Sequence, residues 1–357
     1  MQRRDIFKCF SVGALALMLN KSKIIAQTQE SSIPKSYQNI KKIIKPKALK
    51  EGDTVGIISA ATPAYTPEEI LKIEQVLTYF NLKPYYPKYF FSRNNSINQR
   101  IEEKASDFNE LFANDEIKAI FSIRGGYGSM HILDKIDYKL VEKNPKILIG
   151  YSDITALLIS IFQKTGLITF HGPMLLSKFT NYSVEVFRGV LFGNSEGLIL
   201  TNPNARSGIR DVYPIRTLKD GIAQGRLIGG NLSLITAMLG TDFDIQTDGR
   251  ILFLEDTGEE PYSIDRMLAT LALAHKFDNL SGFIWGKCNE CNQKGAPPIW
   301  DFSIEQSLDY YFRNRTYPSF SGLMIGHTDE QLTLPIGINA EIDASKGSIK
   351  FLENAVE

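Results

Sequence analysis

The residues of this chain that are best suited to chemistry stand where predicted strands end. Ser152 lies in GYSDIT (residues 150–155), directly after the predicted strand 146–149 and before a predicted helix. A serine at such a turn is exposed, and the backbone N–H groups at the start of the helix can stabilise an oxyanion. Ile154 replaces the second glycine of an α/β-hydrolase elbow, so spacing alone also allows Ser152 or Asp153 to be a helix N-cap.

Two more predicted strand ends carry acids and a base. The apolar run LFL (252–254) ends in Glu255 and Asp256, and His327 follows a strand-like segment in IGHTD (325–329). A histidine can accept the proton of a serine, and a carboxylate can orient that histidine and offset its charge. A serine, a glutamate and a histidine at three strand ends therefore form a candidate charge-oriented nucleophile.

The other histidines include one rival for the role of the base. His171, in FHGP (170–173), also stands at a strand end. His131 lies within a predicted helix, and His275 ends a helical segment, where its charge would favour the helix C-terminus. We interpret His131 and His275 as structural residues.

The loop after the predicted strand 117–123 is rich in glycine. It reads Arg124-Gly125-Gly126-Tyr127-Gly128, and glycines let a backbone approach a ligand closely and adopt positive φ angles. The loop lacks the lysine and hydroxyl of a Walker A motif and the order of G-x-G-x-x-G, so a phosphate cradle is only weakly supported. We expect a substrate-facing loop, in which the Arg124 guanidinium could pair with a ligand carboxylate.

The elements that must position these residues alternate between strands and helices. In the N-terminal half we predict strands at 54–59, 84–86, 117–123, 146–149 and 167–170, with helices at 67–80, 98–112 and 153–163. This alternation predicts βαβ units and a parallel sheet, whose ligands gather at the carboxyl ends of the strands. Residues 176–215 are predicted to be an irregular connection. Beyond it we predict strands at 225–228, 250–254, 282–285, 322–325 and 336–342, with helices at 231–239 and 264–274.

Composition places the chain among globular proteins. Its 357 residues are 43% hydrophobic, with 40 basic side chains balanced by 40 acidic ones. The balance gives no basic field for nucleic-acid binding, and no segment reaches the roughly 20 consecutive apolar residues of a membrane span. We therefore expect no nucleic-acid partner and no stable membrane insertion.

The N-terminus departs from this balance. Residues 1–26 hold five basic side chains and one acid, and a largely apolar run of 11 residues, 9–19, follows Arg3 and Arg4. This pattern predicts an export signal with a twin-arginine-like start, and hence a periplasmic or exported protein. Removal of residues 1–26 would leave a net charge of −4. The alternative is an uncleaved N-terminal helix on a cytoplasmic protein.

Three cysteines are too few for a disulfide framework. Cys9 lies in the predicted signal, and Cys288 and Cys291 form C-x-x-C in a polar stretch. That spacing could be redox-active or half of a zinc site, but no second Cys/His pair follows at finger spacing. We expect either an incidental disulfide or two free thiols, and no metal.

Seven ordered motifs resemble the serine LD-carboxypeptidase family, which includes murein tetrapeptide carboxypeptidases and microcin C self-immunity hydrolases. The matching segments are RGGYG (124–128), GYSDIT (150–155), FHGPM (170–174), GGNL (229–232), LED (254–256), DRML (265–268) and GH (326–327). The resemblance covers about residues 50–345.

The resemblance implies a site as well as a fold. Ser152 would be the nucleophile, Glu255 the orienting acid and His327 the general base. The oxyanion hole would come from backbone N–H groups of Asp153 and of the Gly125-Gly126 turn, most simply Gly126. Independently of the resemblance, we expect Arg124, Gly125 and Tyr127 to contact the substrate.

The resemblance also implies an α/β architecture in two domains. A Rossmann-like parallel-sheet domain would carry the nucleophile, and a swivelling β/α/β-type domain would bring the acid and the base. We place an export signal at 1–26, a polar leader at 27–50, the N-terminal domain at 51–178, a linker at 179–215 and the C-terminal domain at 216–357. Family members need no metal or other cofactor and often form homodimers.

The expected reaction cleaves the amide between the L-centre of meso-diaminopimelate and a terminal D-alanine in a small muropeptide. Two alternatives stay open. One is hydrolysis of peptidyl-nucleotide antibiotics, and the other is a non-catalytic periplasmic protein that binds muropeptides. The recycling role of cytoplasmic family members would not suit an exported protein, whereas the reaction itself would.

Overall fold

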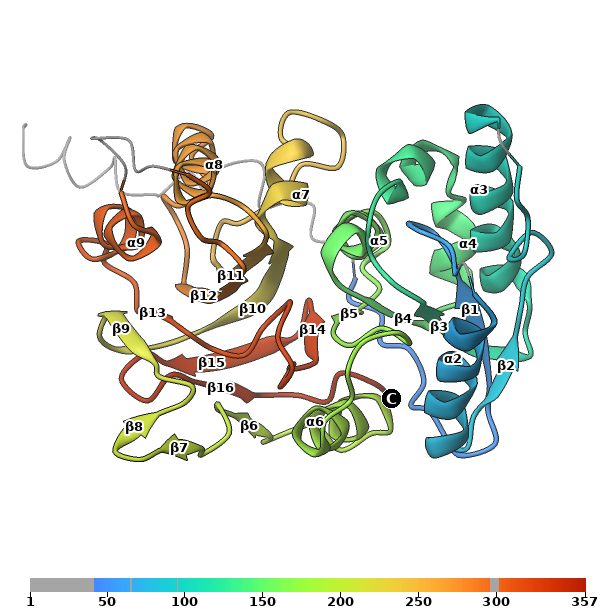
Figure 1. The fold of residues 1–357 in the computed structure, drawn as a ribbon, viewed down its shortest axis with the longest axis horizontal. Coiled ribbons are helices and arrows are strands. Elements are labelled where there is room, and N and C mark those ends of the chain that lie inside the picture. Colours follow the sequence, from blue (N-terminus) through green and yellow to red (C-terminus); the bar gives the residue numbers. More distant parts are fainter. Residues whose placement is uncertain (1–41, 65, 95, 296–301) are drawn as a thin grey trace, which may run out of the picture. The chain divides into compact units, whose positions relative to one another are not determined.

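Two large β-sheets and one two-stranded sheet organise the described part of the chain (Figure 1). A computed structural model describes residues 42–64, 66–94, 96–295 and 302–357, and these residues belong to one compact unit. The predicted export signal, Cys9 and residues 27–41 of the polar leader lie outside the described residues.

The N-terminal half alternates strands and helices as predicted. Its elements are β1 (Thr54–Ile58), α2 (Pro67–Tyr79), β2 (Lys83–Tyr85), α3 (Ile97–Ala113), β3 (Ile117–Ser122), α4 (Tyr138–Lys143), β4 (Ile147–Gly150), α5 (Thr155–Thr165), β5 (Thr169–His171) and α6 (Asn181–Leu191), with 3₁₀ turns at Ser129–Lys135 and Ser152–Ile154. Strands β4 and β5 are entirely buried, which explains their continuous apolar character. Helix α2 begins where expected, because Thr66 and Glu69 form a capping box.

The C-terminal half contains shorter elements around longer central strands. They are β6 (Ile199–Leu200), β7 (Arg206–Ser207), β8 (Arg210–Asp211), β9 (Arg216–Lys219), β10 (Ile222–Asn231), α7 (Leu232–Ala237), β11 (Arg250–Thr257), α8 (Pro261–Leu273), β12 (Gly282–Asn289), α9 (Ile304–Phe312), β13 (Ser319–Ser321), β14 (Leu334–Ile336), β15 (Asn339–Asp343) and β16 (Ser348–Phe351).

The strand orders confirm the predicted α/β fold. The N-terminal sheet has the order β14-β5-β4-β3-β1-β2, in which β1 to β5 are parallel. The larger sheet has the order β6-β16-β15-β10-β11-β12-β13-β9, with β10 to β13 parallel at its centre. Parallel strands therefore present their carboxyl ends in both sheets, which is where ligand sites form in α/β proteins.

One predicted strand is wrong in an informative way. The sequence predicts a single strand at 336–342, but the chain turns at Gly337, where φ is +104°. Strand β14 ends before this turn and pairs antiparallel with β5, whereas β15 follows it and pairs with β10. A side chain at Gly337 would overlap the ring of Phe162, so only glycine permits the turn. A segment of the predicted C-terminal domain thus completes the N-terminal sheet.

Other predictions need correction as well. Residues 322–325 are not a strand, because the strand β13 ends at Ser321 and Gly322 has a φ of +103°. The region 176–215 is not wholly irregular, since it contains α6, whose buried residues recur at helical spacing. Helix α9 was also not predicted, although Ser303 and Gln306 form a capping box at its start.

Helix α5 meets the larger sheet through two small groups. A methyl group built on Gly230 would lie 2.6 Å from Cγ2 of Thr155, and the Asn231 N–H donates to Oγ1 of Thr155 over 3.1 Å. Gly230 of GGNL therefore lets the end of β10 approach the first turn of α5, which begins three residues after Ser152, whereas Gly229 lies against the backbone of Phe253. The domain boundaries at 178 and 215 stay predictions.

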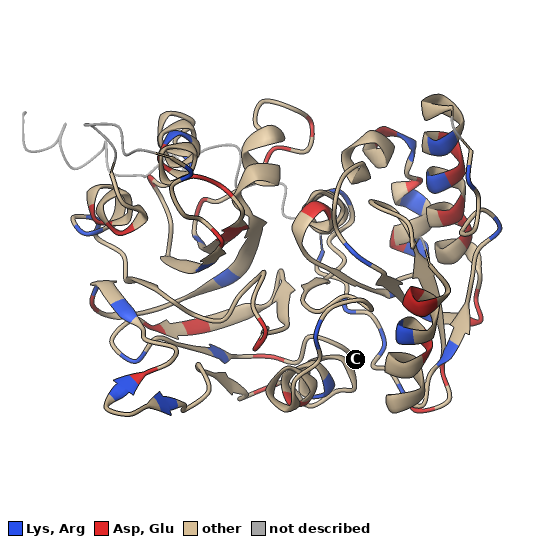
Figure 2. Ribbon diagram, viewed as in Figure 1, with Lys and Arg blue, Asp and Glu red and all other residues tan. Residues whose placement is uncertain are grey.

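Charges are mixed on the exposed elements. Figure 2 shows basic and acidic residues interspersed along α3. Among the described residues, no helix is long and apolar enough to cross a membrane.

Candidate active site

Ser152 occupies a sharp turn between β4 and α5. Its φ is +59°, a left-handed conformation that is uncommon for residues other than glycine and that costs about 1–3 kcal/mol. Gly150 makes the turn sterically possible, because a methyl group there would lie 2.7 Å from Cγ2 of Ile154. The N-cap positions of the 3₁₀ turn and of α5 are Tyr151 and Ile154, so neither Ser152 nor Asp153 is a helix N-cap and the structure favours the strained-turn interpretation.

The glycine loop after β3 lies directly against this serine. A methyl group built on Gly125 would lie 2.7 Å from Cβ and 2.8 Å from Oγ of Ser152, and 3.5 Å from the backbone nitrogen of Asp153. Gly126 has a φ of +110°, and a side chain there would collide with Thr62. The Thr62 N–H donates to the Gly125 carbonyl over 3.2 Å, which holds the loop in place. The two backbone segments predicted to form the oxyanion hole are therefore adjacent.

The side chain of Asp153 has a structural role. It is buried, and its Oδ2 accepts the Ser129 N–H over 2.8 Å. Burial raises the pKa of Asp153, although the hydrogen bonds from Ser129 oppose that shift. Only the backbone of Asp153 is thus a candidate for catalysis.

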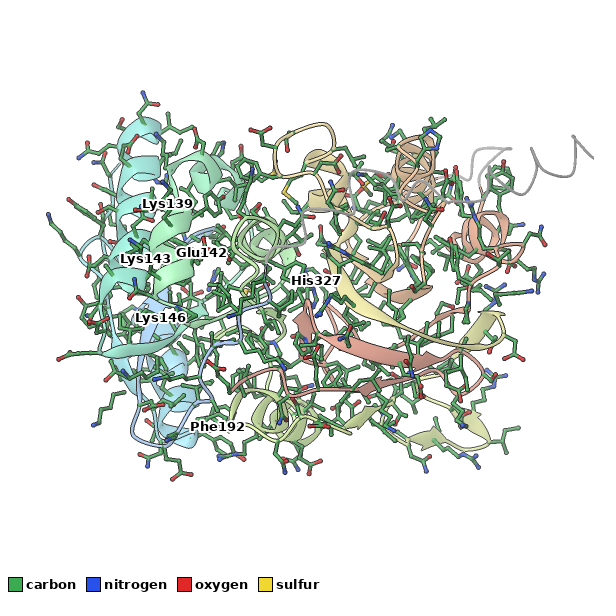
Figure 3. The ribbon with its side chains drawn as sticks, turned by 180° about the vertical axis from the view of Figure 1, so that it is seen from behind. Lys139, Glu142, Lys143, Lys146, Phe192 and His327 are labelled. Atoms are coloured by element: carbon green, nitrogen blue, oxygen red, sulfur yellow. A yellow bond between two sulfur atoms is a disulfide. The ribbon has the colours of Figure 1, made fainter. Side chains whose placement is uncertain are left out.

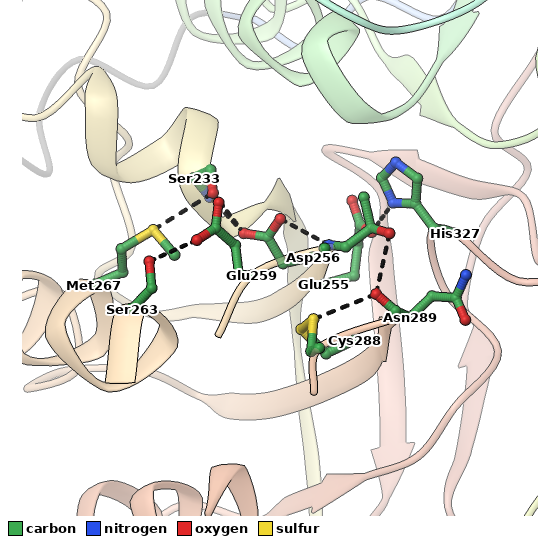
Figure 4. The surroundings of a disulfide bond; sticks show 12 residues. Ser233, Glu255, Asp256, Glu259, Ser263, Met267, Cys288, Asn289 and His327 are labelled. Carbon is green, nitrogen blue, oxygen red and sulfur yellow. Dashed lines mark hydrogen bonds and ion pairs between the residues drawn. A yellow bond between two sulfur atoms is a disulfide. The ribbon is translucent and has the colours of Figure 1, made fainter. Parts of the chain in front are cut away.

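Glu255 and His327 form a hydrogen-bonded pair (Figure 4). Oε2 of Glu255 lies 2.8 Å from Nδ1 of His327, which comes from the loop after β13. Gly326, with a φ of +88°, lets this loop approach, because a side chain there would overlap the Glu255 carboxylate. The Glu255 side chain is fully buried, whereas 18% of the His327 side chain is exposed. The bond through Nδ1 leaves Nε2 of His327 to act on a substrate or a nucleophile.

The rival histidine lies on the opposite oxygen of the same acid. His171 ends β5 and is fully buried, and its Nε2 lies 3.6 Å from Oε1 of Glu255. That distance is too long for a hydrogen bond, and neither ring nitrogen of His171 has any hydrogen-bond partner among the described residues. We therefore treat the contact as electrostatic.

Burial would raise the pKa of Glu255, but its interactions with His171 and His327 outweigh that effect and lower the pKa to about 2. The carboxylate is consequently ionised at neutral pH, as an orienting acid must be. The ring of Tyr151 packs on His327 with its centroid 4.8 Å away, which restricts the movement of the base.

Ser152 and His327 line one cavity of about 430 Å³. Thr62, Gly125 and Gly126 contribute to its wall. His327, labelled in Figure 3, lies on this wall, and Glu255 lies behind it. The structure therefore brings together a serine, a histidine and a glutamate that are separated by up to 175 residues in the chain, counted from Ser152 to His327.

Two predicted substrate contacts have different surroundings. Arg124 lines the cavity, but its guanidinium also forms an ion pair with Glu69 of α2. Tyr127 does not line the cavity of Ser152 and instead borders a smaller neighbouring cavity. Thr62, which the sequence analysis did not single out, follows the end of β1, and its position after a parallel strand is the signal that could have identified it.

The second acid of the LED motif stabilises the local fold. Oδ1 of Asp256 accepts from Nδ2 of Asn231 over 3.0 Å, and Oδ2 accepts from Oγ of Ser233 over 2.8 Å. Its neighbour in the sheet register is Cys288, which forms a disulfide with Cys291. Of the two states expected for Cys288 and Cys291, a disulfide or two free thiols, the structure has the disulfide. In the described part of the chain, no group of three His, Cys, Asp or Glu residues could hold a metal ion.

The other two histidines lie elsewhere. His131 is in a 3₁₀ turn beside Tyr127, not in an α-helix. His275 follows α8 with a φ of +59°, and its Nδ1 lies 2.8 Å from Oδ2 of Asp278. Neither lines the cavity that holds Ser152.

Comparisons with known proteins match both halves of the chain. A family model described as the LD-carboxypeptidase N-terminal domain matches residues 55–172, and one described as the C-terminal domain matches residues 224–342. A probable murein peptide carboxypeptidase of Bacillus subtilis is 36% identical over 305 residues, covering 85% of this chain and 92% of that protein. The microcin C7 self-immunity protein MccF of Escherichia coli is 32% identical over 329 residues, covering 85% and 94%.

Solved structures agree with these relatives. A structure of MccF without ligand has a TM-score of 0.78 and 30% sequence identity, and covers 88% of this chain and 100% of that chain. A structure of MccF in complex with aspartyl sulfamoyl adenosine has the same TM-score and 29% identity, and covers 88% of this chain and 100% of that chain.

Proposed function

The chain belongs to the LD-carboxypeptidase family of serine peptidases, and from this premise we propose that it releases terminal D-alanine from murein tetrapeptides by cleaving the amide to meso-diaminopimelate. One observation carries the assignment of the residues. His327 faces the cavity of Ser152 while its Nδ1 lies 2.8 Å from a buried, ionised Glu255. This is the arrangement of a nucleophile, a base and an orienting acid.

The proposed reaction proceeds through an acyl-enzyme. Oγ of Ser152 attacks the scissile carbonyl carbon while its proton moves to Nε2 of His327, and the backbone N–H groups of Gly126 and Asp153 stabilise the oxyanion. Collapse breaks the C–N bond, and His327 gives the proton to the departing amine of D-alanine. A water molecule, deprotonated by His327, then attacks the ester, and the proton returns to Ser152 as the acid product leaves. Glu255 stays ionised throughout and holds the imidazole in one orientation.

Arg124 is the cation that we assign to the terminal carboxylate of the substrate. It lines the cavity, and its pairing with Glu69 limits the conformations of its long side chain. We expect Arg124→Ala to raise KM for the tetrapeptide by about tenfold or more, because a charge-assisted hydrogen bond contributes about 1.5–3 kcal/mol. Steady-state kinetics check this, and an unchanged KM would exclude the role.

The proposed function is tested by D-alanine release. The purified full-length chain is incubated with muropeptide tetrapeptide, and a tetrapeptide ending in L-alanine serves as the substrate control. We expect release of D-alanine from the first only. No release by the wild-type protein would overturn the murein assignment, and release that persists in Ser152→Ala would overturn the mechanism. Ser207→Ala, on an exposed strand, is the matched control variant.

A second candidate function is hydrolysis of peptidyl-nucleotide antibiotics. It is favoured by the likeness to MccF and by a second cavity of about 320 Å³, which shares Leu176 and Ser177 with the cavity of Ser152 and is lined by Tyr79 and Phe179. Aromatic rings of this kind can stack on a nucleobase. The same assay, run with an aminoacyl sulfamoyl adenosine as a competitor, separates the two substrates. Tighter inhibition than by the tripeptide product would favour the nucleotide.

Membership among the serine peptidases argues against the third alternative, a non-catalytic muropeptide-binding protein. Covalent labelling of Ser152 by a serine-reactive phosphonate is the direct test, since a binding protein has no activated nucleophile.

We further propose that the protein is exported and acts on peptide stems outside the cytoplasm. The twin-arginine-like start of residues 1–26 supports this, and so does the Cys288–Cys291 disulfide, because disulfides persist in oxidising compartments. Fractionation of cells that express the full chain tests the location, with Arg3→Lys/Arg4→Lys as the signal variant. A homodimer also stays a prediction, which light scattering on the purified chain can check.

A further inference from the structure

A small cavity of about 130 Å³ adjoins the glycine loop, and the proposed reaction gives it no function. We call it the α3 basic cavity. It is lined by Ile97, Arg100, Ile101, Lys104, Tyr127, Gly128 and His131. Three of these side chains are basic and none is acidic. Its volume is too small for a peptide but suits a single carboxylate or phosphate group.

The two strongest cations of this cavity repel each other. Arg100 and Lys104 are four residues apart on α3, a spacing at which like charges destabilise a helix. Burial lowers the pKa of Lys104, and the neighbouring charge of Arg100 lowers it further. Within the described residues, neither Arg100 nor Lys104 forms a salt bridge. Nζ of Lys104 instead donates a hydrogen bond to the Ala61 carbonyl over 2.5 Å.

Asp153 and the two acids between Arg100 and Lys104 on α3 have other partners. Oδ2 of Asp153, whose charge favours protonated Lys104, accepts the Ser129 N–H. On α3 itself, Glu102 pairs with Lys135, and the Glu103 carboxylate accepts from Ser92 and Asn94. The positive charge of the cavity is therefore not balanced by a carboxylate that lines it.

Gly128 of the glycine loop lies against two of these donors. Gly128 has a φ of +123°, and a methyl group there would lie 3.2 Å from Nζ of Lys104 and 3.9 Å from Nδ1 of His131. Nε2 of His131 lies 3.3 Å from the Tyr127 hydroxyl, and that contact ties the exposed Tyr127 to the rim. Any other residue at this position would narrow the space that Gly128 leaves open.

Short backbone links join the α3 basic cavity to the cavity of Ser152. Nζ of Lys104 donates a hydrogen bond to the carbonyl of Ala61, and Thr62, which follows Ala61 in the chain, lines the cavity of Ser152. Gly126 lines the same cavity, and Gly128 of the same loop lines the basic one. An extended substrate that reaches Ser152 could thus place a second negative group at Arg100 and Lys104.

We propose that the α3 basic cavity is a second anion subsite, which binds a substrate carboxylate other than that of the terminal D-alanine. The inference rests on the proposed function, whose substrate is a peptide with several carboxylates. The planar Arg100 guanidinium can hold such a group through two hydrogen bonds, and the bound charge would relieve the repulsion between Arg100 and Lys104. The subsite would select anionic stem peptides over amidated ones.

The first experiment tests anion binding without turnover. Inorganic phosphate is titrated with the full-length chain and followed by phosphorus NMR line broadening. We expect broadening with the wild-type protein, at least a roughly tenfold weaker effect with Arg100→Gln, and no change with Arg210→Gln, which removes another exposed arginine. If Arg100→Gln and Arg210→Gln broaden the signal equally, the subsite does not exist.

The second experiment identifies the carboxylate. KM and kcat are measured for the parent tetrapeptide, for a form with D-isoglutamine in place of D-isoglutamate, and for a form with L-lysine in place of meso-diaminopimelate. We expect one of the modified peptides to have a KM about tenfold higher with the wild-type enzyme, and Arg100→Gln to abolish that difference while kcat stays within about twofold. The peptide that responds shows which carboxylate binds.

Two results distinguish the possible failures. If Arg100→Gln changes KM for all three peptides by the same factor, the cavity does not bind a substrate carboxylate, and the proposal is overturned although D-alanine is released. If phosphate binding depends on Arg100 but the wild-type protein releases no D-alanine, the anion site stands and the proposed substrate is wrong.

Discussion

The two sheets supply the active site in opposite ways. The N-terminal sheet presents Ser152 on a strained turn and surrounds it with glycine backbone, so that its contribution consists of a side chain at the cavity wall and N–H groups. The larger sheet supplies Glu255, a fully buried ion. His327, the proposed base, lies between that ion and the cavity.

Because Ser152 lies at the cavity wall and Glu255 is buried, substitutions at the two residues should affect catalysis and stability to different extents. A residue at the cavity wall whose backbone is strained can be replaced at little cost to the fold. A buried carboxylate between two histidines cannot, because loss of one member leaves the others without a partner. The nucleophile side should therefore respond to substitution in rate, and the acid side in both rate and stability.

Ser152→Ala should have the largest effect on rate and almost none on stability. Without the nucleophile we expect kcat to fall by on the order of 10⁶-fold, with the melting temperature unchanged or slightly higher. D-alanine release and thermal unfolding measure the two quantities. A clear loss of stability in Ser152→Ala would contradict the proposed contrast.

Glu255→Gln should reduce both kcat and the free energy of unfolding. The amide can no longer hold His327 in the required tautomer, so we expect kcat to fall by about 10⁴-fold. The free energy of unfolding should fall by about 3–5 kcal/mol, as when one partner of a buried charged network is removed. Kinetics and urea unfolding measure these effects, and Glu341→Gln, on the partly exposed strand β15, is the control. If only kcat falls, the acid is not important for folding.

Gly125→Ala tests the backbone contribution of the N-terminal sheet. The added methyl group would lie 2.8 Å from Oγ of Ser152, so either the serine or the glycine loop must move. Displacement of one oxyanion donor lowers kcat by about 10²–10³-fold, and we expect a loss in that range. Gly189→Ala, where the nearest atom would be 3.6 Å away, should retain full activity.

His171→Gln should have the smallest effect and reveals how the acid is kept ionised. The pKa of Glu255 is lowered to about 2 in the folded protein, so its contribution to stability is present above its ordinary value of 4.5 and is lost as the pH falls toward 2. Removal of His171 should raise that pKa and lower the free energy of unfolding at pH 7 by about 1–2 kcal/mol. The difference from the wild-type protein should narrow below about pH 4.5.

Urea unfolding at pH 7 and at pH 3.5 measures this change. His275→Gln removes an exposed histidine whose contact with Asp278 is open to solvent, so it should stay close to the wild-type protein at both pH values. A deficit for His171→Gln that stays constant with pH would mean that packing, and not charge, is what His171 contributes.

The predicted α/β fold is confirmed, whereas the roles of the predicted site residues stay predictions. Ser152, Glu255 and His327 each follow or end a β-rich segment, and alternating strands and helices made a parallel sheet the expected support. Their residue types made them a candidate nucleophile, base and acid, and the resemblance to a known family implied the same three roles. Spacing could not show that they meet, because their proximity depends on the pairing of β10 with β11 and on the approach that Gly230 permits to Thr155.

Other features of the structure could not be predicted from local sequence patterns, because they depend on tertiary contacts. The predicted strand 336–342 is divided between two sheets by the positive φ of Gly337, and only tertiary packing against Phe162 decides this. His171 was a rival for the base because its strand end was recognised, but not its relation to Glu255. Tyr127 was grouped with the substrate contacts of Ser152, yet the loop turns at Gly126 and directs it toward His131.

The pairing of β14 with β5 also has a consequence for folding during synthesis. Strand β14 pairs with β5, which leaves the ribosome roughly 160 residues earlier, and at about 5–20 residues per second the edge of β5 waits some 10–30 s for its partner. During that interval a buried, hydrophobic strand is open to pairing with other chains. A truncated chain that ends before residue 334 would keep this edge exposed permanently, so the nucleophile half should aggregate unless the last residues are supplied as a separate peptide.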